Sequence, residues 1–588
     1  MKFYLSNILF IFFYASTFAS LSILLKNKSR IIVFTFCYLF FTSYFLLQAL
    51  HFTVFKNFVL VSKIPLIKEA LDVKDVVDFK IGVIHLLYII PTTSIFLIYC
   101  YKHMKEKKLE INKKSFYKRK NNTYIRILII LILVYTMLNK IYSIADTDES
   151  FLRKEIIDSN DFISRYGFMD FVINDITKSI KESIPFIRQN SNNSNLKQLD
   201  TYFNERSIEK DSSNEMSKIF KDKNLILITS ESFAPYGINK ELTKTLYKLK
   251  ETGIYFDNYY SSNVGTIDTE FTMLTSLIPT YNKGRVSYTY ANNASKFTMP
   301  SMFKANGYTT MAFHNYWDKY YNRKLYMPTL GFDSYKGMES LEIPKIEEGL
   351  DDFPKDIDLF RNSFDDYMNE EKFFAYYMTV SGHGAYYEER ISLLEDHQKV
   401  EKLYGDTLPY TTKYYLASQM QLDKGIEYLL SKLEETGLIE NTVIVIVGDH
   451  YPYLIGDDEI REVFNIEDEL DLYKIPFIIW SKDIESKLED RIMTTLDILP
   501  TLGNMFDINT RYSMGVDVYN SSVDSMVRWN NQRAFSFLNK DIYYDRSIGK
   551  TKYNGNASEE DAKRILRRNY EEFLFSKWII ETNYFATK

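Results

Sequence analysis

Acidic residues and histidines follow four short apolar runs in the second half of the chain, where they could hold a metal ion and a phosphoryl group. The runs are rich in β-branched or aromatic residues and alternate with helical patterns, which predicts buried strands of a parallel sheet. Asn224–Thr229 precedes Glu231, Tyr308–Phe313 precedes His314, Phe373–Val380 precedes His383, and Thr442–Val447 precedes Asp449 and His450. Because ligands of open α/β sheets bind beyond the carboxyl ends of the strands, these side chains are expected to form one site.

The carboxylates and imidazole at these strand ends form a mixed oxygen and nitrogen donor set when a hydroxyl is added. Glu231, Asp449 and His450 would suit Mn²⁺, Mg²⁺ or Zn²⁺, and no cysteine is present after Cys100 to select zinc. Two adjacent ligands can face one metal where the backbone turns at the end of a strand. Taken alone, Asp449 could equally cap a helix and His450 could be an ordinary surface residue.

A hydroxyl at the start of a predicted helix could supply the nucleophile. Gly265-Thr266 precedes the periodic stretch Ile267–Leu277, so a helix should begin near Thr266. Backbone N–H groups at such a start favour an anion, and a metal on the hydroxyl would make it a better nucleophile. Without other support, a threonine in this place is more often an ordinary helix cap.

One aromatic-rich loop and one glycine-flanked bend carry further candidates. His314 and Arg323 share a loop, and arginine suits bidentate contact with phosphate. The aromatics of that loop could wall a glycerol-like group, although packing is their ordinary role in a chain with 47 Tyr. His383, between Gly382 and Gly384, could donate a proton to a phosphate or a leaving oxygen.

Composition narrows the classes of function. A chain of 588 residues is too long for one core, so two or more domains are expected. The net charge of −5 does not indicate a nucleic-acid surface. The two cysteines, Cys37 and Cys100, lie in apolar runs near the start, so the rest of the chain carries neither a disulfide framework nor a thiolate metal site.

Four apolar segments are each near the ~20 residues that a membrane-spanning helix needs. They are roughly Tyr4–Leu25, Ile31–Phe55, Ile81–Tyr101 and Tyr124–Tyr142. Positively charged loops stay in the cytoplasm, and the loop Lys102–Lys120 holds nine Lys or Arg against two Glu, whereas Lys56–Lys80 is nearly balanced. Both termini and the large C-terminal region are therefore expected outside the cell.

The predicted organisation has three parts. Residues 1–145 form a transmembrane domain, 146–220 a linker with helices, and 221–588 an outer catalytic domain, with a small hairpin and helix subdomain from about 520. Within the linker, Gln189–Gln198 is predicted to be flexible. Within the subdomain, Arg533–Tyr553 is predicted to be a hairpin and Ser558–Ile580 a helix. Ser143-Ile144-Ala145 resembles a signal-peptidase site at which the outer domain could be released, although such triplets are common by chance.

Taken together, these segments resemble the lipoteichoic acid synthase family, within the alkaline phosphatase and sulfatase superfamily. The matching segments are ILITSESF around Glu231, GTIDTEFTM around Thr266, FHNYWDKYYNR from His314 to Arg323, SGH at His383 and VGDH at Asp449-His450. Their order and spacing are specific, whereas no single segment is decisive. The resemblance implies an α-helical membrane domain and an extracellular, sulfatase-like (alkaline phosphatase-like) α/β domain with a mostly parallel sheet, in a multi-pass protein of the cell membrane.

The resemblance also implies roles for individual residues. One divalent ion, in first place Mn²⁺, would be bound by Glu231, Thr266, Asp449 and His450, and Thr266 would also be the catalytic nucleophile. Phosphoglycerol would be surrounded by His314, Tyr321, Arg323 and His383. The chain departs from the family at Tyr321, where Trp is usual, at Tyr316, where an acidic residue is usual, and in its four readable spans, where five are typical. These departures concern the substrate and the membrane part more than the metal chemistry.

The implied function is a metal-dependent phosphoglycerol transferase in lipoteichoic acid synthesis. It would move phosphoglycerol from the phospholipid phosphatidylglycerol to a glycolipid or glycerol-phosphate polymer through a covalent threonine intermediate. A sulfatase would need Cys or Ser within C/S-x-P-x-R, which Thr266-Ile267-Asp268 lacks. A phosphoethanolamine transferase, another phosphoalcohol transferase or phosphodiesterase, and an inactive sulfatase-like sensor remain alternatives. The outer domains of phosphoethanolamine transferases usually carry disulfides. An inactive sulfatase-like sensor would be expected to have lost a metal ligand.

Overall fold

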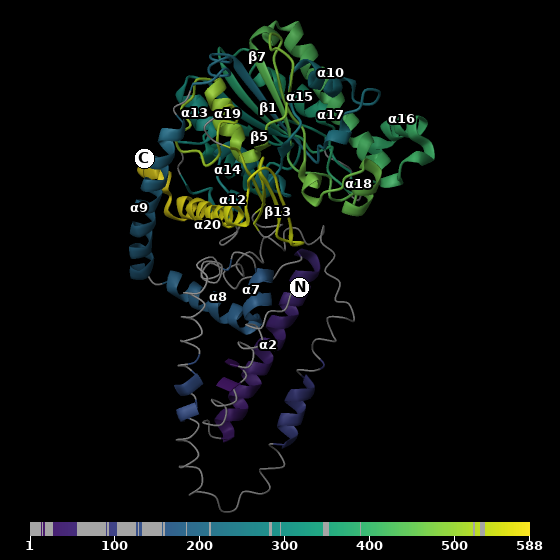
Figure 1. Ribbon diagram of the computed structural model, residues 1–588. Coiled ribbons are helices and arrows are strands. Elements are labelled where there is room, and N and C mark those ends of the chain that lie inside the picture. The colour runs from purple at the N-terminus through teal and green to yellow at the C-terminus, as the bar shows by residue number, and fades with distance from the viewer. Residues whose placement is uncertain are drawn as a thin grey trace, which may run out of the picture. The chain divides into compact units, whose positions relative to one another are not determined.

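The computed structural model in Figure 1 has two compact units, Met1–Asn190 and Ser191–Lys588. The structure describes residues 13–14, 16–17, 27–55, 90, 93–102, 125–127, 129–131, 134, 156, 159–183, 185–210, 213–280, 285–293, 296–344, 352–387, 390–520, 524–529 and 535–588.

In the first unit, helix α2 (Asn27–Phe55) contains a segment fit to cross a membrane. Its stretch Ile31–Ala49 has a mean hydropathy of 1.8 and is the one helix of sufficient length and apolarity among the described residues. Of the other three predicted spans and the basic loop Lys102–Lys120, the structure describes only residues 13–14, 16–17, 90, 93–102, 125–127, 129–131 and 134. Two further helices, α7 (Ser159–Tyr166) and α8 (Phe168–Ser183), bury aromatic side chains against each other.

Helix α9 (Pro185–Lys210) includes the whole of Gln189–Gln198, so the structure has a helix where a flexible linker was predicted, and the boundary between the two units falls within that stretch. The prediction relied on the Asn and Ser content of those ten residues. It did not weigh the next two turns, where the side chains of Leu199 and Phe203 are almost completely buried in the second unit. Packing of such apolar side chains stabilises a helix whose intrinsic propensity is low.

The second unit is built on an eight-stranded sheet of order β5-β4-β6-β1-β7-β8-β2-β9. Its strands are β1 (Asn224–Ser230), β2 (Ile254–Phe256), β4 (Thr309–His314), β5 (Ser334–Lys336), β6 (Phe373–Met378), β7 (Thr442–Gly448), β8 (Phe477–Trp480) and β9 (Lys487–Glu489). The four predicted strands are β4, β6, β1 and β7, and they are adjacent and parallel. β8 runs antiparallel to both of its neighbours. The prediction of a mostly parallel α/β sheet is confirmed.

Helices cover both faces of this sheet, which explains why β1 and β7 are buried along their whole length and read as continuous apolar runs. In Figure 1, α10, α15 and α17 lie to one side of β1 and β7, and α13 and α19 lie to the other. The helices are α10 (Lys244–Thr252), α11 (Thr266–Thr275), α12 (Val286–Thr289), α13 (Met299–Ala305), α14 (Arg323–Leu330), α15 (Asp356–Ser363), α16 (Leu394–Tyr404), α17 (Tyr410–Glu435), α18 (Asp457–Phe464) and α19 (Ile498–Met505). Along α17, Leu422, Ile426 and Leu429 form an apolar stripe at helical spacing that enters the main core.

The C-terminal part adds a small antiparallel sheet and a long helix. Strands β11 (Val527–Trp529), β12 (Ser536–Leu538), β13 (Ile542–Asp545) and β14 (Lys550–Tyr553) pair in that order, so the predicted hairpin is part of a four-stranded sheet. The predicted helix is α20 (Glu559–Thr582), and Ser558 and Asp561 cap it reciprocally. A further two-stranded ladder joins β3 (Tyr259–Tyr260) and β10 (Met493–Thr494).

A buried cluster of charges joins this C-terminal part to α9. The carboxylate of Glu572 on α20 accepts from Arg206 of α9 at 3.2 Å and from Arg568 at 3.2 Å, and it lies 2.7 Å from Arg528 of β11. Because Glu572 is only 1% exposed, this charge would be costly to bury without its arginine partners. The second half of α9 therefore belongs structurally to the second unit.

Candidate metal and phosphoryl-transfer site

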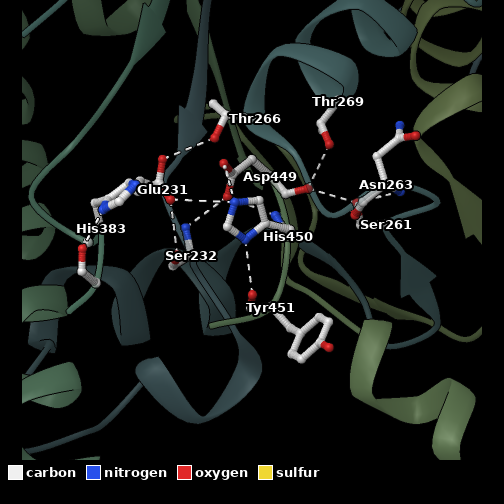
Figure 2. A network of polar contacts seen from close by, with 12 residues as sticks. Glu231, Ser232, Ser261, Asn263, Thr266, Thr269, His383, Asp449, His450 and Tyr451 are labelled. Carbon is white, nitrogen blue, oxygen red and sulfur yellow. Dashed lines mark hydrogen bonds and ion pairs between the residues drawn. The ribbon is translucent and has the colours of Figure 1, made fainter. Parts of the chain in front are cut away.

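Register between two parallel strands brings the predicted metal ligands together. β1 and β7 pair so that Ser230 lies opposite Gly448, and the next residues along each chain are Glu231 and Asp449. Glu231 and Asp449 therefore lie side by side at the carboxyl-terminal edge of the sheet, and His450 is the next residue after Asp449 (Figure 2). One ligand atom each from Glu231, Asp449 and His450 lies within 4.8 Å of the others.

His450 presents one ring nitrogen to these carboxylates. Its Nε2 lies 3.5 Å from Oε1 of Glu231 and 3.3 Å from Oδ2 of Asp449. Its Nδ1 is 3.0 Å from the carbonyl oxygen of Tyr451, and a carbonyl can only accept, so Nδ1 carries the proton of that bond. In neutral histidine this leaves the Nε2 lone pair facing the carboxylates, as a metal ligand requires.

The electrostatics of the three buried groups fit a cation. Burial raises the pKa of Asp449 to about 7, and the nearby charge of Glu231 adds to that rise. Burial alone would lower the pKa of His450, but the charges of Asp449 and Glu231 raise it above its ordinary value. Oδ2 of Asp449 is buried and has no hydrogen-bond partner among the described residues. A divalent ion would satisfy that oxygen and offset both negative charges, so the residues present fit a metal.

Thr266 lies at the first position of α11 and faces this cluster. Its hydroxyl donates to Oε2 of Glu231 at 3.2 Å. The N-cap position belongs to Gly265, so the reading of Thr266 as an ordinary cap is not what the structure has. One turn along α11, Thr269 donates to the backbone carbonyl of Asp449 at 2.9 Å and thereby ties the helix to the end of β7 (Figure 2).

Ser232 is a site residue that the sequence analysis missed. Its backbone N–H donates to Oδ1 of Asp449 at 2.8 Å, and its hydroxyl donates to Oε1 of Glu231 at 3.0 Å. It adopts the left-handed region with φ of 52°, which is uncommon for a non-glycine residue. The available signal was a serine directly after a carboxylate at a strand end.

His383 lies on a loop that packs against the backbone of Glu231. A methyl group placed on Gly382 would come within 2.1 Å of the Glu231 carbonyl oxygen, so the two segments are in close contact. The loop is held by buried Asp356, which accepts from the N–H groups of Val380 and Ser381 at 3.1 Å each. His383 thus lies beside the cluster of Glu231, Asp449 and His450, and its role there stays a prediction (Figure 2).

His314, Tyr321 and Arg323 form a second group. Nδ1 of His314 is 2.9 Å from the carbonyl oxygen of Met378, and burial, followed by the charge of Arg323, holds the pKa of His314 well below its ordinary value. The ring of Tyr321 lies 5.5 Å from Cζ of Arg323. Nε of Arg323 donates to the carboxylate of Glu270, another residue that the sequence analysis did not identify. Helix α11 connects the two groups, because it carries Thr266 and Glu270 one turn apart.

Comparison with known proteins defines the class of this fold. Residues 223–508 match the sulfatase family model. The crystal structure of the lipoteichoic acid synthase LtaP from Listeria monocytogenes aligns with a TM-score of 0.55 and 22% identity, and the match covers 64% of this chain and 98% of that one. The expected sulfatase-like α/β fold is confirmed.

Among named proteins, the chain is similar to lipoteichoic acid synthases. It is 24% identical over 438 residues to lipoteichoic acid synthase 2 of Bacillus subtilis (strain 168), which covers 69% of this chain and 64% of that protein. It is 25% identical over 426 residues to lipoteichoic acid synthase of Staphylococcus saprophyticus, and this match covers 68% of this chain and 62% of that protein. The chain thus spans somewhat less than two thirds of the length of these relatives. The resemblance inferred from the sequence is confirmed, and the roles of individual residues stay predictions.

Proposed function

We propose that the protein is a membrane-anchored, metal-dependent phosphotransferase that moves phosphoglycerol from phosphatidylglycerol to a glycerol-phosphate polymer. One observation carries this proposal: the hydroxyl of Thr266, at the start of a helix, donates to a carboxylate of the buried cluster of Glu231, Asp449 and His450. A hydroxyl next to a cation site and at a helix N-terminus is suited to attack a phosphoryl group. The similarity to named lipoteichoic acid synthases supports glycerol phosphate as the group transferred.

The metal would be held by Glu231, Asp449 and His450 together with the Thr266 hydroxyl. Their oxygen and imidazole donors suit Mn²⁺ in first place, and Mg²⁺ or Zn²⁺ as alternatives. When bound, the ion would stabilise negative charge on the phosphoryl oxygens and favour loss of the hydroxyl proton.

The protein's own residues would carry the two half-reactions. Oγ1 of Thr266 forms a bond to the lipid phosphorus, and the bond from phosphorus to the diacylglycerol oxygen breaks. The hydroxyl proton of Thr266 would pass to Oε2 of Glu231, to which it already donates at 3.2 Å. His383 would give the leaving oxygen its proton and then take one from the acceptor hydroxyl. The acceptor oxygen displaces Thr266 from phosphorus, and the proton held by Glu231 returns to restore the Thr266 hydroxyl. Arg323 would hold the phosphate, with His314 and Tyr321 around the glycerol.

The membrane part would keep the enzyme at its lipid substrate. Helix α2 supplies one span, and the predicted four-span arrangement would place the catalytic domain outside the cell, where the head groups of the outer leaflet lie. Glycolipids or glycerol-phosphate chains at the same surface would serve as acceptors. Release of the outer domain near Ser143-Ile144-Ala145 would separate the catalyst from its lipid donor.

The nucleophile is tested by Thr266→Ala, with Thr275→Ala on the same helix as the matched control. Full-length protein is incubated with lipids labelled in different head groups, with and without Mn²⁺. We expect Thr266→Ala to abolish transfer while Thr275→Ala retains it, because loss of the nucleophile removes the covalent route. Mass spectrometry of wild-type protein should find a phosphoglycerol adduct on Thr266. Full activity in a well-folded Thr266→Ala protein would show the mechanism to be wrong, and preferred turnover of an ethanolamine head group would favour the alternative transferase.

A further inference from the structure

Glu270, one helical turn after the proposed nucleophile Thr266, forms a buried ion pair with Arg323. Nε of Arg323 donates to both carboxylate oxygens of Glu270 at 3.3 Å, and the hydroxyl of Tyr376 donates to Oε2 of Glu270 at 3.1 Å. Arg323 is 1% exposed and Glu270 is completely buried. Burying a charged pair carries a large desolvation cost, so the pair is weak evidence of a purely stabilising role.

Helix geometry relates this pair to Thr266. Thr266 and Glu270 are four residues apart on α11, so their side chains lie on the same face of the helix, about one turn or about 6 Å apart along the axis. Thr266 faces Glu231, and Glu270 faces Arg323. The guanidinium therefore contacts the residue that lies one helical turn along α11 from the hydroxyl that would attack phosphorus.

The terminal nitrogens of Arg323 point to an anion. Nη1 and Nη2 are buried and have no hydrogen-bond partner among the described residues. Donors of a buried charge that lack partners are expensive to maintain, and a phosphate would supply two parallel acceptors for them. The guanidinium is planar, so fixing its Nε edge also fixes the direction of both terminal nitrogens.

We infer that Glu270 is a positioning residue that holds the Nε edge of Arg323 so that the two terminal nitrogens meet the substrate phosphate. The hydrogen bond from Tyr376 also orients the Glu270 carboxylate. The inference rests on the proposed function, because that function makes Arg323 a phosphate ligand. A positioning role of Glu270 differs from an electrostatic one. The negative charge of Glu270 weakens the attraction of Arg323 for an anion, whereas the orientation that Glu270 gives to the guanidinium favours anion binding.

The opposing signs of charge and geometry make the inference testable. Full-length protein in detergent is titrated with inorganic phosphate, with binding followed by ³¹P NMR, in Glu270→Gln, Arg323→Lys and the double variant. We expect Glu270→Gln to weaken phosphate binding by roughly tenfold or more, the scale for a misplaced substrate contact. Because Glu270 acts through Arg323, the double variant should bind no more weakly than Arg323→Lys alone. Unchanged or tighter binding in Glu270→Gln, or additive losses in the double variant, would overturn the inference.

A matched variant separates positioning from folding. Glu572→Gln makes the same substitution in another buried, arginine-paired glutamate away from the site, and it should lower the melting temperature without changing phosphate affinity. A parallel loss of phosphate binding in Glu572→Gln would assign the Glu270→Gln result to folding and contradict the inference. Should Glu270→Gln not fold, Glu270→Asp keeps the charge but shortens its reach. The hydrogen bonds from Arg323 Nε to Glu270 are already long at 3.3 Å, so Glu270→Asp should also weaken phosphate binding. Unchanged phosphate affinity in Glu270→Asp would contradict the inference.

Turnover distinguishes this inference from the proposed function. In Glu270→Gln, KM for the lipid should rise while the metal content stays that of wild type, because the lost contact serves substrate binding. Thr275→Ala, on the same helix, keeps Thr266, Glu270 and Arg323, so it should bind phosphate as wild type does. Transfer that persists in Thr266→Ala would refute the proposed mechanism and leave the Glu270 result standing.

Discussion

At the scale of single residues, the candidate metal cluster combines features that an apolar core would not tolerate by itself. Two carboxylates and an imidazole are buried within a few ångströms of one another. Ser232 and Thr266 use hydrogen bonds to hold the carboxylate oxygens in place. Such pre-organisation limits the rearrangement needed when an ion binds, and it links metal binding to the stability of the sheet edge.

Metal removal should therefore destabilise the catalytic domain. A ligand present at about 100 times its Kd stabilises the folded state by about 2.7 kcal/mol, so a chelator should lower the melting temperature measurably. Asp449→Ala combined with His450→Ala should lose both the bound metal and the chelator effect. The matched control is Asp497→Asn, a buried aspartate outside the cluster, which should keep its metal by elemental analysis. Unchanged metal content in the double variant would contradict the site.

Asp423, a buried carboxyl group outside the candidate metal cluster, should make the stability of the protein depend on pH. Burial raises the pKa of Asp423 to about 6, although its carboxylate accepts the N–H of Leu246 at 2.7 Å. The unfolded value is about 3.9, so the folded state holds the proton more tightly and the stability that this gives is lost as pH rises from about 4 to 6.

Asp423→Asn should remove this dependence. Between pH 4 and 7, wild type should lose about 2–3 kcal/mol of unfolding free energy relative to the variant. One pKa unit corresponds to about 1.4 kcal/mol. Denaturant unfolding at a series of pH values measures the difference. A constant difference between the two proteins across this range would contradict the assignment.

At the scale of secondary structure, the site depends on how tightly the loop after β6 packs on the end of β1. A Cβ on Gly382 would lie 2.1 Å from the Glu231 carbonyl oxygen and 3.0 Å from Nε2 of Gln419. Gly382→Ala must therefore move the loop of His383 or the backbone of Glu231, and both belong to the proposed site.

We expect Gly382→Ala to lose most of its transfer activity and to be destabilised by about 1–3 kcal/mol, as overpacked positions are. The control, Gly555→Ala, has φ of +60° and no atom within 4 Å, so it should lose about 1 kcal/mol from backbone strain alone and remain fully active. Activity and melting temperature, measured on both variants, separate displacement of the site from general strain. Equal activity in the two would indicate that the contact is not important.

The strands and their terminal residues could be predicted from sequence because each depends on local pattern. β1, β4, β6 and β7 are apolar runs, and residues that directly follow parallel strands must share one edge. Glu270 could not be found in this way, since its importance arises from a salt bridge to a residue 53 positions away. For Ser232 the available local signal was its place directly after Glu231. The helical state of Gln189–Gln198 was missed for a related reason, because packing of the turns that follow decides it.

At the scale of the whole molecule, the distribution of basic residues predicts that both termini lie outside. Single cysteines at Lys113 and Asn195, in a background lacking Cys37 and Cys100, would test this on intact cells with an impermeant thiol reagent. Position 195 should react and position 113 should not, because the basic loop is retained in the cytoplasm. Lysed cells provide the control in which both positions react. Labelling of position 113 alone would invert the topology and with it the access of the enzyme to outer-leaflet lipid.

The charge cluster around Glu572 determines where the catalytic domain can be separated from the rest of the chain. A fragment that begins at residue 221 discards Arg206 and leaves Glu572 with one fewer buried cation, whereas a fragment that begins at residue 146 keeps the cluster whole. A protease that cuts near residue 145 would thus release a domain with its internal charges balanced. One that cuts within α9 after residue 206 would release a domain with an electrostatic defect, open to unfolding and further degradation.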